Sequence, residues 1–133
     1  DDGAKGLYYF PLVQCRTADT QSAAYTDAFG GPELANEAIR TLSLTNSAQC
    51  PAIPTIAKAY ALNVTAFPGG SPMPFLTIFP TGQPRPNASM LNAFEGQTVT
   101  NSTILPAGTA GAIDLFAYRR THAAVEIGGY FSR

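Results

Sequence analysis

The feature that most constrains the fold is a regular alternation of short β-type segments with turns rich in proline and glycine. It is clearest from Leu62 to Pro86, LNVTAFPGGSPMPFLTIFPTGQPRP, where PGGSP and PTGQPRP interrupt β-branched and aromatic residues. Val, Ile, Thr and Phe suit a pleated strand, whereas proline and glycine favour turns. Segments of this kind recur about every 8–12 residues, a spacing typical of all-β domains. They are residues 7–13, 40–45, 57–67, 74–79, 89–94, 98–106, 112–118 and 122–131.

About eight short strands with this spacing predict an all-β, single-domain β-sandwich or jelly-roll-like fold. At most one short helix is expected, at residues 32–39 (PELANEAI), with Pro32 at its first position. A chain of 133 residues is long enough for one domain. We expect residues 1–6 to be an N-terminal extension and residues 7–133 to be the domain.

Three finer expectations concern neighbouring segments. Residues 57–67 form the longest segment, and both of its faces are small or apolar, which predicts a central strand covered on both sides. The polar residues 16–31 are expected to be a long loop. The segments 112–118 and 122–131 are expected to pair with each other across a short turn.

Charge and hydropathy exclude several classes of partner. The formal net charge is −1 and no basic run is present, so we expect no nucleic-acid partner, which needs a cationic surface. No apolar run reaches the length of a transmembrane helix. The opening DDGAKG has neither the basic nor the apolar region of a signal peptide, as expected of a processed chain. Low charge with many hydroxyl and amide side chains is typical of secreted β-proteins, and we expect a secreted or cell-surface location.

The two cysteines, Cys15 and Cys50, leave two alternatives open. A disulfide would close a loop of about 35 residues and add about 4 kcal/mol to the free energy of unfolding in the loop-entropy model. Otherwise both would be buried thiols. The secreted type of composition favours the disulfide.

The sequence offers little material for catalysis. Cys15 and His122, the single histidine, could act as nucleophile and base, but a disulfide-bonded Cys15 and a turn histidine are the simpler interpretation. Asp114 and Glu126 could form a carboxylate pair for glycoside hydrolysis, although two ordinary outward residues are favoured. The aspartates are scattered, and no metal-binding pattern selects a cation. We therefore expect no enzymatic activity, no metal site and no cofactor.

Three Asn-x-Ser/Thr triplets are candidate glycosylation sites. Asn87 lies among prolines in a turn and is the best candidate, followed by Asn101. Asn63 lies in the middle of a predicted strand, where its amide is expected to satisfy a buried backbone group.

Five ordered blocks of the sequence resemble a bacterial secreted domain family. They are FPLVQCRTADTQ, GGPELANEAIRTLSL, CPAIPTIAKAYALNVT, LTIFPTGQPRPNASMLN and NSTILPAGTAGAIDLFAYRRTHAAVEIGGYF. The blocks cover almost the whole chain, about residues 8–131. The resemblance implies export, supports a Cys15–Cys50 bridge, and makes the chain one domain; it carries over no catalytic residues. One departure is Gln21, where the family has Arg, and it implies that Arg16 and Asp19 pair with each other.

Two functions from different classes follow. The first is a non-enzymatic, extracellular structural subunit that assembles with itself into a surface fibre or filament. The aromatic N-terminal segment, with Leu7, Tyr8, Tyr9 and Phe10 as candidate contacts, would add a strand to a neighbouring subunit. Pairing of this segment within its own domain is the somewhat favoured alternative. The second function is a carbohydrate- or surface-ligand-binding module, although tryptophan is absent.

Overall fold

The structure is a computed structural model that describes residues 6–133. In this part of the chain, eight strands carry the fold. They are β1 (Tyr8–Asp19), β2 (Ile39–Ser43), β3 (Ala59–Phe67), β4 (Met73–Pro80), β5 (Leu91–Ala93), β6 (Val99–Pro106), β7 (Ala112–Tyr118) and β8 (His122–Ser132). Three single 3-10 turns join them: η2 (Asp27–Phe29), η3 (Leu44–Asn46) and η4 (Thr109–Gly111). The expected N-terminal extension lies outside the described residues except for Gly6.

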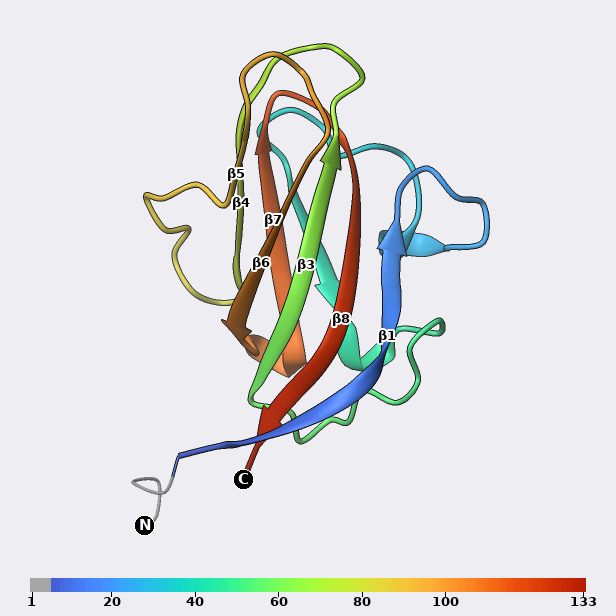
Figure 1. Ribbon diagram of the computed structural model, residues 1–133, viewed down its shortest axis with the longest axis vertical. Coiled ribbons are helices and arrows are strands. Elements are labelled where there is room, and N and C mark those ends of the chain that lie inside the picture. Colours follow the sequence, from blue (N-terminus) through green and yellow to red (C-terminus); the bar gives the residue numbers. More distant parts are fainter. Residues whose placement is uncertain (1–5) are drawn as a thin grey trace.

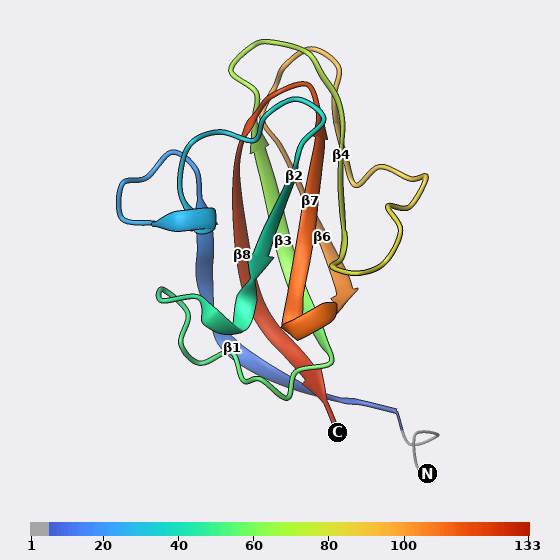
Figure 2. The same ribbon diagram turned by 180° about the vertical axis from the view of Figure 1, so that it is seen from behind.

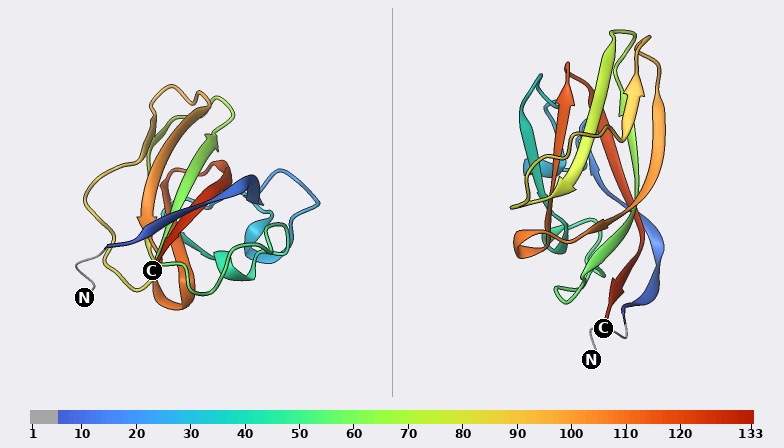
Figure 3. Two further views of the ribbon diagram at one scale, coloured as in Figure 1. Left: turned by 60° about the horizontal axis from the view of Figure 1, so that its bottom comes forward. Right: turned by 90° about the vertical axis from the view of Figure 1, so that its left-hand side faces the viewer.

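The strands form two antiparallel sheets of four strands each, stacked as the two layers of a sandwich (Figures 1 and 3). Sheet 1 has the order β1-β8-β3-β6 and sheet 2 the order β2-β7-β4-β5. The first strand therefore pairs with the last, β2 with β7, β3 with β6, and β4 with β5. This nested pairing is the topology of a jelly roll. The predicted all-β sandwich is confirmed.

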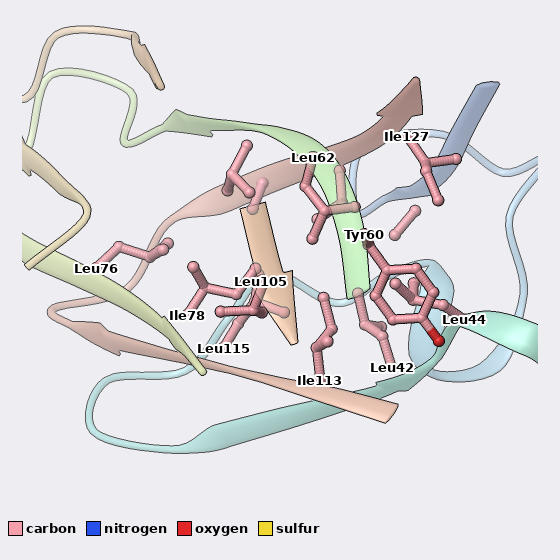
Figure 4. Close-up of a cluster of buried hydrophobic side chains, with 14 of the residues drawn as sticks. Leu42, Leu44, Tyr60, Leu62, Leu76, Ile78, Leu105, Ile113, Leu115 and Ile127 are labelled. Atoms are coloured by element: carbon pink, nitrogen blue, oxygen red, sulfur yellow. The ribbon is translucent and has the colours of Figure 1, made fainter. Parts of the chain in front are cut away.

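The core fills the space between the two sheets. On β3, Tyr60, Leu62 and Val64 alternate inward and are buried, as expected for residues that share one face of a strand. Figure 4 shows Tyr60 and Leu62 with leucines and isoleucines of both sheets in one cluster. β3 is central, as predicted, but the expectation that both its faces are covered is wrong. Its outer residues Ala61 and Asn63 are half-buried, because nothing in residues 6–133 forms a third layer over sheet 1.

The predicted helix at residues 32–39 is wrong. Leu34 is buried and forms a β-bridge with Thr121. The Glu37 N–H donates to the Ala117 carbonyl at 2.9 Å. These contacts take the backbone groups that a helix would use, so the tertiary partners override the local helix propensity. The described residues contain only 3-10 turns as helical structure.

The strand β1 is longer than predicted, because residues 16–19 continue it instead of opening a loop. Thr17, Ala18 and Asp19 are buried, and the ladder continues to Asp19 opposite Ala124. The polar character of RTAD suggested a loop, but Arg16 and Asp19 bind each other at the sheet edge, while the buried Thr17 hydroxyl has no hydrogen-bond partner among the described residues. The loop after β1 is accordingly shorter and ends at β2.

The predicted pairing of residues 112–118 with 122–131 is also wrong. β7 lies between β2 and β4 in sheet 2, whereas β8 lies between β1 and β3 in sheet 1. The short link Arg119–Thr121 crosses from one sheet to the other, with a positive φ of 78° at Arg119. Asp114 and Glu126 therefore lie in different sheets and do not face each other as a carboxylate pair.

Candidate functional site

An apolar segment at the edge of sheet 1 consists of Leu7 and the first three residues of β1, Tyr8 to Phe10; we call it the arm. All four of its side chains are exposed, and Tyr8 has 65% of its surface accessible. In the single chain, Tyr8, Tyr9 and Phe10 pair with Ser132, Phe131 and Tyr130 of β8. The segment thus pairs within its own domain, while its other edge and most of its aromatic surface face solvent.

A wide bulge separates the arm from the rest of β1. The register runs from Pro11 opposite Gly129 to Cys15 opposite Ile127. Three residues of β1, Leu12 to Gln14, therefore face the single Gly128. Val13 in this bulge is 94% exposed. Figure 1 shows that β1 bends here and that its first part crosses the lower end of β8. Such a bulge re-aims a strand and locally interrupts its pairing.

The arm is held on β8 by aromatic side chains. The Tyr9 hydroxyl donates to the Gly128 carbonyl at 3.1 Å, and its ring lies 5.0 Å from that of Phe131. Phe10 stacks on Tyr130 at 5.2 Å. A Cβ at Gly129 would come within 2.5 Å of ring carbons of Tyr9, so a larger residue at this position would displace the ring from its place on β8.

The part of β1 after the bulge is fixed covalently. Cys15 forms a disulfide with Cys50 across 35 residues, which confirms the predicted bridge. An activated thiol at Cys15 is therefore excluded, and the hypothesis of a Cys15–His122 pair is wrong.

Charged side chains strengthen the same attachment. Arg16 donates to Asp19 at 2.8 Å, the ion pair expected from the sequence, and also to Glu126 of β8 at 3.0 Å. Gln14 reaches the other oxygen of Glu126 at 2.8 Å. The hydrogen bond to Asp19, with that to Glu126, raises the pKa of Arg16 above its ordinary value. The Gln21 N–H completes the cluster by donating to Asp19 at 2.9 Å.

His122 joins the start of β8 to the end of β1. Its Nδ1 shares a hydrogen bond of 2.8 Å with the hydroxyl of Thr20, and its Nε2 lies 3.9 Å from the Glu33 carboxylate. The order of hydroxyl, imidazole and carboxylate resembles a catalytic triad. Thr20, however, is buried and its oxygen already accepts the Ala123 N–H at 3.0 Å. These hydrogen bonds connect the end of β1 with the start of β8.

The three candidate glycosylation asparagines differ in how their amides are engaged. Asn63 accepts from the Ser102 hydroxyl on the outer face of sheet 1, so the expectation that it serves a buried backbone group is wrong. Asn101 donates to the Met90 carbonyl at 3.1 Å and accepts the Ser102 N–H at 2.9 Å. Asn87 lies exposed in the loop between β4 and β5.

A hollow of about 300 Å³ lies between that loop and sheet 2. Its lining combines aromatic, amide, hydroxyl and guanidinium groups: Pro74, Phe75, Thr77, Arg85, Pro86, Asn87, Ala88, Ser89, Asn92 and Phe94. Hydrogen bonds hold the loop in place, because the Thr77 hydroxyl donates to the Ala88 carbonyl at 3.1 Å and the Met90 N–H donates to the Leu76 carbonyl at 2.9 Å. Figure 2 shows this loop beside β4 on the side away from β7.

Three stacked rings run beside the hollow on the outer face of sheet 2; we call Phe116, Phe75 and Tyr118 the aromatic row. Phe75 lies 6.0 Å from Phe116 and 5.5 Å from Tyr118. The Arg85 guanidinium lies 4.0 Å over Phe116 at one end, and that of Arg119 lies 4.3 Å over Tyr118 at the other. Cations over ring faces are attracted by the ring quadrupole.

This row could not be predicted from the sequence. The only local signal was the spacing of Phe116 and Tyr118, which places both on one face of a strand. The contacts with Phe75 and Arg85 join segments about 30–40 residues apart, and only the strand order β7-β4 brings them together.

No protein-family model and no curated protein matches the sequence. The resemblance to the bacterial secreted domain family therefore stays a prediction. Among residues 6–133, no helix is long and apolar enough to cross a membrane, and no three potential ligands from His, Cys, Asp and Glu gather in one place.

Proposed function

We propose that this protein is an exported structural subunit that assembles with copies of itself into an extracellular fibre. The observation that supports this most is the arm. It is an exposed aromatic segment, followed by a bulge and then by the half of the same strand that the disulfide fixes. Export is supported by the disulfide, since such bonds persist in oxidising compartments.

The proposed step is an exchange of arms. The arm of one subunit leaves its own β8 and takes the equivalent place on the β8 of a neighbour. The same ladder and ring contacts form again, so the exchange of identical elements costs little. The Cys15–Cys50 bridge limits the exchanged segment to residues before Cys15, because everything after it is tied to its own subunit.

In the proposed exchange, each arm passes to the next subunit and none is returned to its donor, so the chain of subunits stays open. Donor and acceptor use different surfaces, the arm on one subunit and the edge of β8 on the next. Head-to-tail contacts of this kind form filaments when the rotation does not close. Low net charge, −1 for the whole chain, leaves little repulsion between neighbouring subunits.

A register-specific cross-link tests the proposal. Tyr9 and Phe131 are direct partners in the β1–β8 ladder, and we expect the double variant Tyr9→Cys, Phe131→Cys to form a disulfide between them. If arms are exchanged, non-reducing electrophoresis of assembled material will show a ladder of covalent multimers. Negative-stain electron microscopy of the same sample should show filaments.

Three controls make the test decisive. Each single cysteine variant should give no ladder beyond dimers, and deletion of Asp1–Phe10 should abolish the filaments. A cross-link confined to monomers within intact filaments would overturn the exchange of arms. Filaments that persist after the deletion would overturn the role of the arm, and a monomer under all conditions would overturn the assembly function.

A carbohydrate-binding module is the second candidate, and the hollow beside the aromatic row is the observation that favours it. Sugars bind in sites that combine aromatic faces with a few placed polar groups. Phe94, which is 66% exposed, offers a ring face at the rim, and Asn87 and Ser89 offer an amide and a hydroxyl. A jelly roll is also found in lectin domains, although this is an analogy at the level of fold.

A further inference from the structure

We propose that the outer face of sheet 2 binds a carboxylated polysaccharide, one built of uronate sugars. The inference rests on the second candidate function and names its ligand class. It is independent of the arm, which lies on an edge of sheet 1. The juxtaposition that supports it is an unbroken sequence of Arg85, the aromatic row and Arg119 beside a polar hollow.

The arginines on this face carry positive charge that a carboxylated ligand could use. In residues 6–133, the ion pairs of arginine involve Arg16 with Asp19 and Glu126, and Arg120 with Glu33. The guanidinium groups of Arg85 and Arg119 lie over rings instead. A guanidinium stacked on a ring keeps its N–H donors, which lie in its plane, available to a carboxylate.

Acids also lie near this surface, among them Asp114, Glu95 and the exposed Glu37, whose N–H donates to the Ala117 carbonyl of β7. Asp114 is on the same face of β7, but it is buried and one of its oxygens accepts the hydroxyls of both Thr41 and Thr81 at 2.7 Å. Glu95 follows Phe94 in the turn after β5. The carboxylate of Asp114 is thus engaged inside the protein, while both arginines are exposed.

The size and the rim of the hollow suit a sugar ring. The hollow, at about 300 Å³, lies at the lower end of the range for small-molecule sites, which suits single sugar units. The exposed ring of Phe94 at its rim offers a stacking face for a pyranose, and Arg85 lines the same hollow. Arginines at both ends of the row would meet carboxylates that repeat along a chain. A uronate polymer therefore fits better than a neutral one.

The test compares oligogalacturonate with its methyl ester, which has the same sugars without the charge. Isothermal titration calorimetry on the full chain at physiological salt should show binding of the acid and at least about tenfold weaker binding of the ester, since charge-assisted hydrogen bonds contribute about 1.5–3 kcal/mol. Arg85→Gln should weaken binding of the acid about tenfold or more. Phe94→Ala should weaken both ligands.

Matched variants guard against general effects. Arg133→Gln removes the same charge from the exposed C-terminus, and Ile104→Ala removes exposed apolar surface from β6 in the other sheet; both should bind as the wild type does. Equal loss with Arg133→Gln would overturn the site. Equal binding of acid and ester would overturn the uronate inference and leave the carbohydrate function standing. No binding of either ligand would overturn both.

Discussion

At the scale of single residues, Tyr60 links the stability of the core to pH. Its ring is fully buried and its hydroxyl donates to the Gly111 carbonyl at 2.7 Å. Burial raises the pKa of Tyr60 to about 12, from 10.0 for an ordinary tyrosine, because the ionised form would lose its hydration. The stability that the neutral ring contributes is therefore fully present below pH 10 and is lost as the pH rises to about 12.

We expect the free energy of unfolding to fall over this alkaline range, and to fall less in Tyr60→Phe. The phenylalanine cannot ionise, but it leaves the Gly111 carbonyl without its donor, at a cost of about 1 kcal/mol near neutral pH. Urea unfolding curves at a series of pH values measure both effects. Tyr8→Phe, at an exposed position, is the control and should follow the wild type. A pH dependence that Tyr60→Phe leaves unchanged would contradict the assignment.

Asp114 is a second residue whose local contacts predict a large effect. Its carboxylate accepts two threonine hydroxyls, from β2 and from the residue after β4. Hydrogen bonds to a charged group contribute about 1.5–3 kcal/mol each, so Asp114→Ala should lower the free energy of unfolding by about 3 kcal/mol. Glu95→Ala, on an exposed turn, should change it by less than about 0.5 kcal/mol. Denaturant unfolding of both variants measures this difference. Equal effects would show that the two hydrogen bonds to the Asp114 carboxylate do not stabilise the fold.

At the scale of elements, the disulfide should control how firmly the edge strand β1 is attached. Replacing both Cys15 and Cys50 by serine removes the covalent bridge that closes a loop of 35 residues. In the loop-entropy model, we expect the free energy of unfolding to fall by about 4 kcal/mol. Amide hydrogen exchange should then become faster in β1, while β7, between two neighbours in sheet 2, keeps its protection. Uniformly faster exchange in both strands would show that the bridge stabilises the whole sandwich rather than the edge.

The strands themselves could be predicted because their signals are local. In β3 the alternation of Tyr60, Leu62 and Val64 marks the buried face directly. The segment 32–39 could not be predicted, because its conformation depends on contacts with Thr121 and Ala117, about 80 residues later. The order of the strands could not be predicted either, because it also depends on contacts between segments far apart in the chain.

In the candidate sites, too, local features could be predicted and long-range contacts could not. The disulfide and the Arg16–Asp19 pair could be proposed from the sequence, because each joins residues within motif blocks. The aromatic row could not, since it requires β7 to lie beside β4 rather than beside β8. A short link between two strands suggests a hairpin, and only packing of both sheets on one core decides otherwise.

At the scale of the whole molecule, the two proposed activities use separate surfaces. The arm and the C-terminus lie at one end of sheet 1 (Figure 1), whereas the aromatic row lies on the outer face of sheet 2. A filament joined through arms would therefore leave the sheet 2 face of every subunit free. Assembly would then repeat the sugar site along the fibre, and repeated sites bind a polymer far more strongly than one site does.

If the arm serves assembly, the rest of the sandwich should fold without it. Leu12 and Cys15 are the first described residues that pack against the buried core, so deletion of Asp1–Phe10 removes no core side chain. We expect the free energy of unfolding to fall by only about 2 kcal/mol, less than two fully buried aromatic side chains would contribute. Guanidinium unfolding and the near-ultraviolet circular dichroism of the truncated chain measure this. A truncated chain that cannot fold would contradict this prediction, because the arm would then supply a large part of the stability of the sandwich, whichever subunit it comes from.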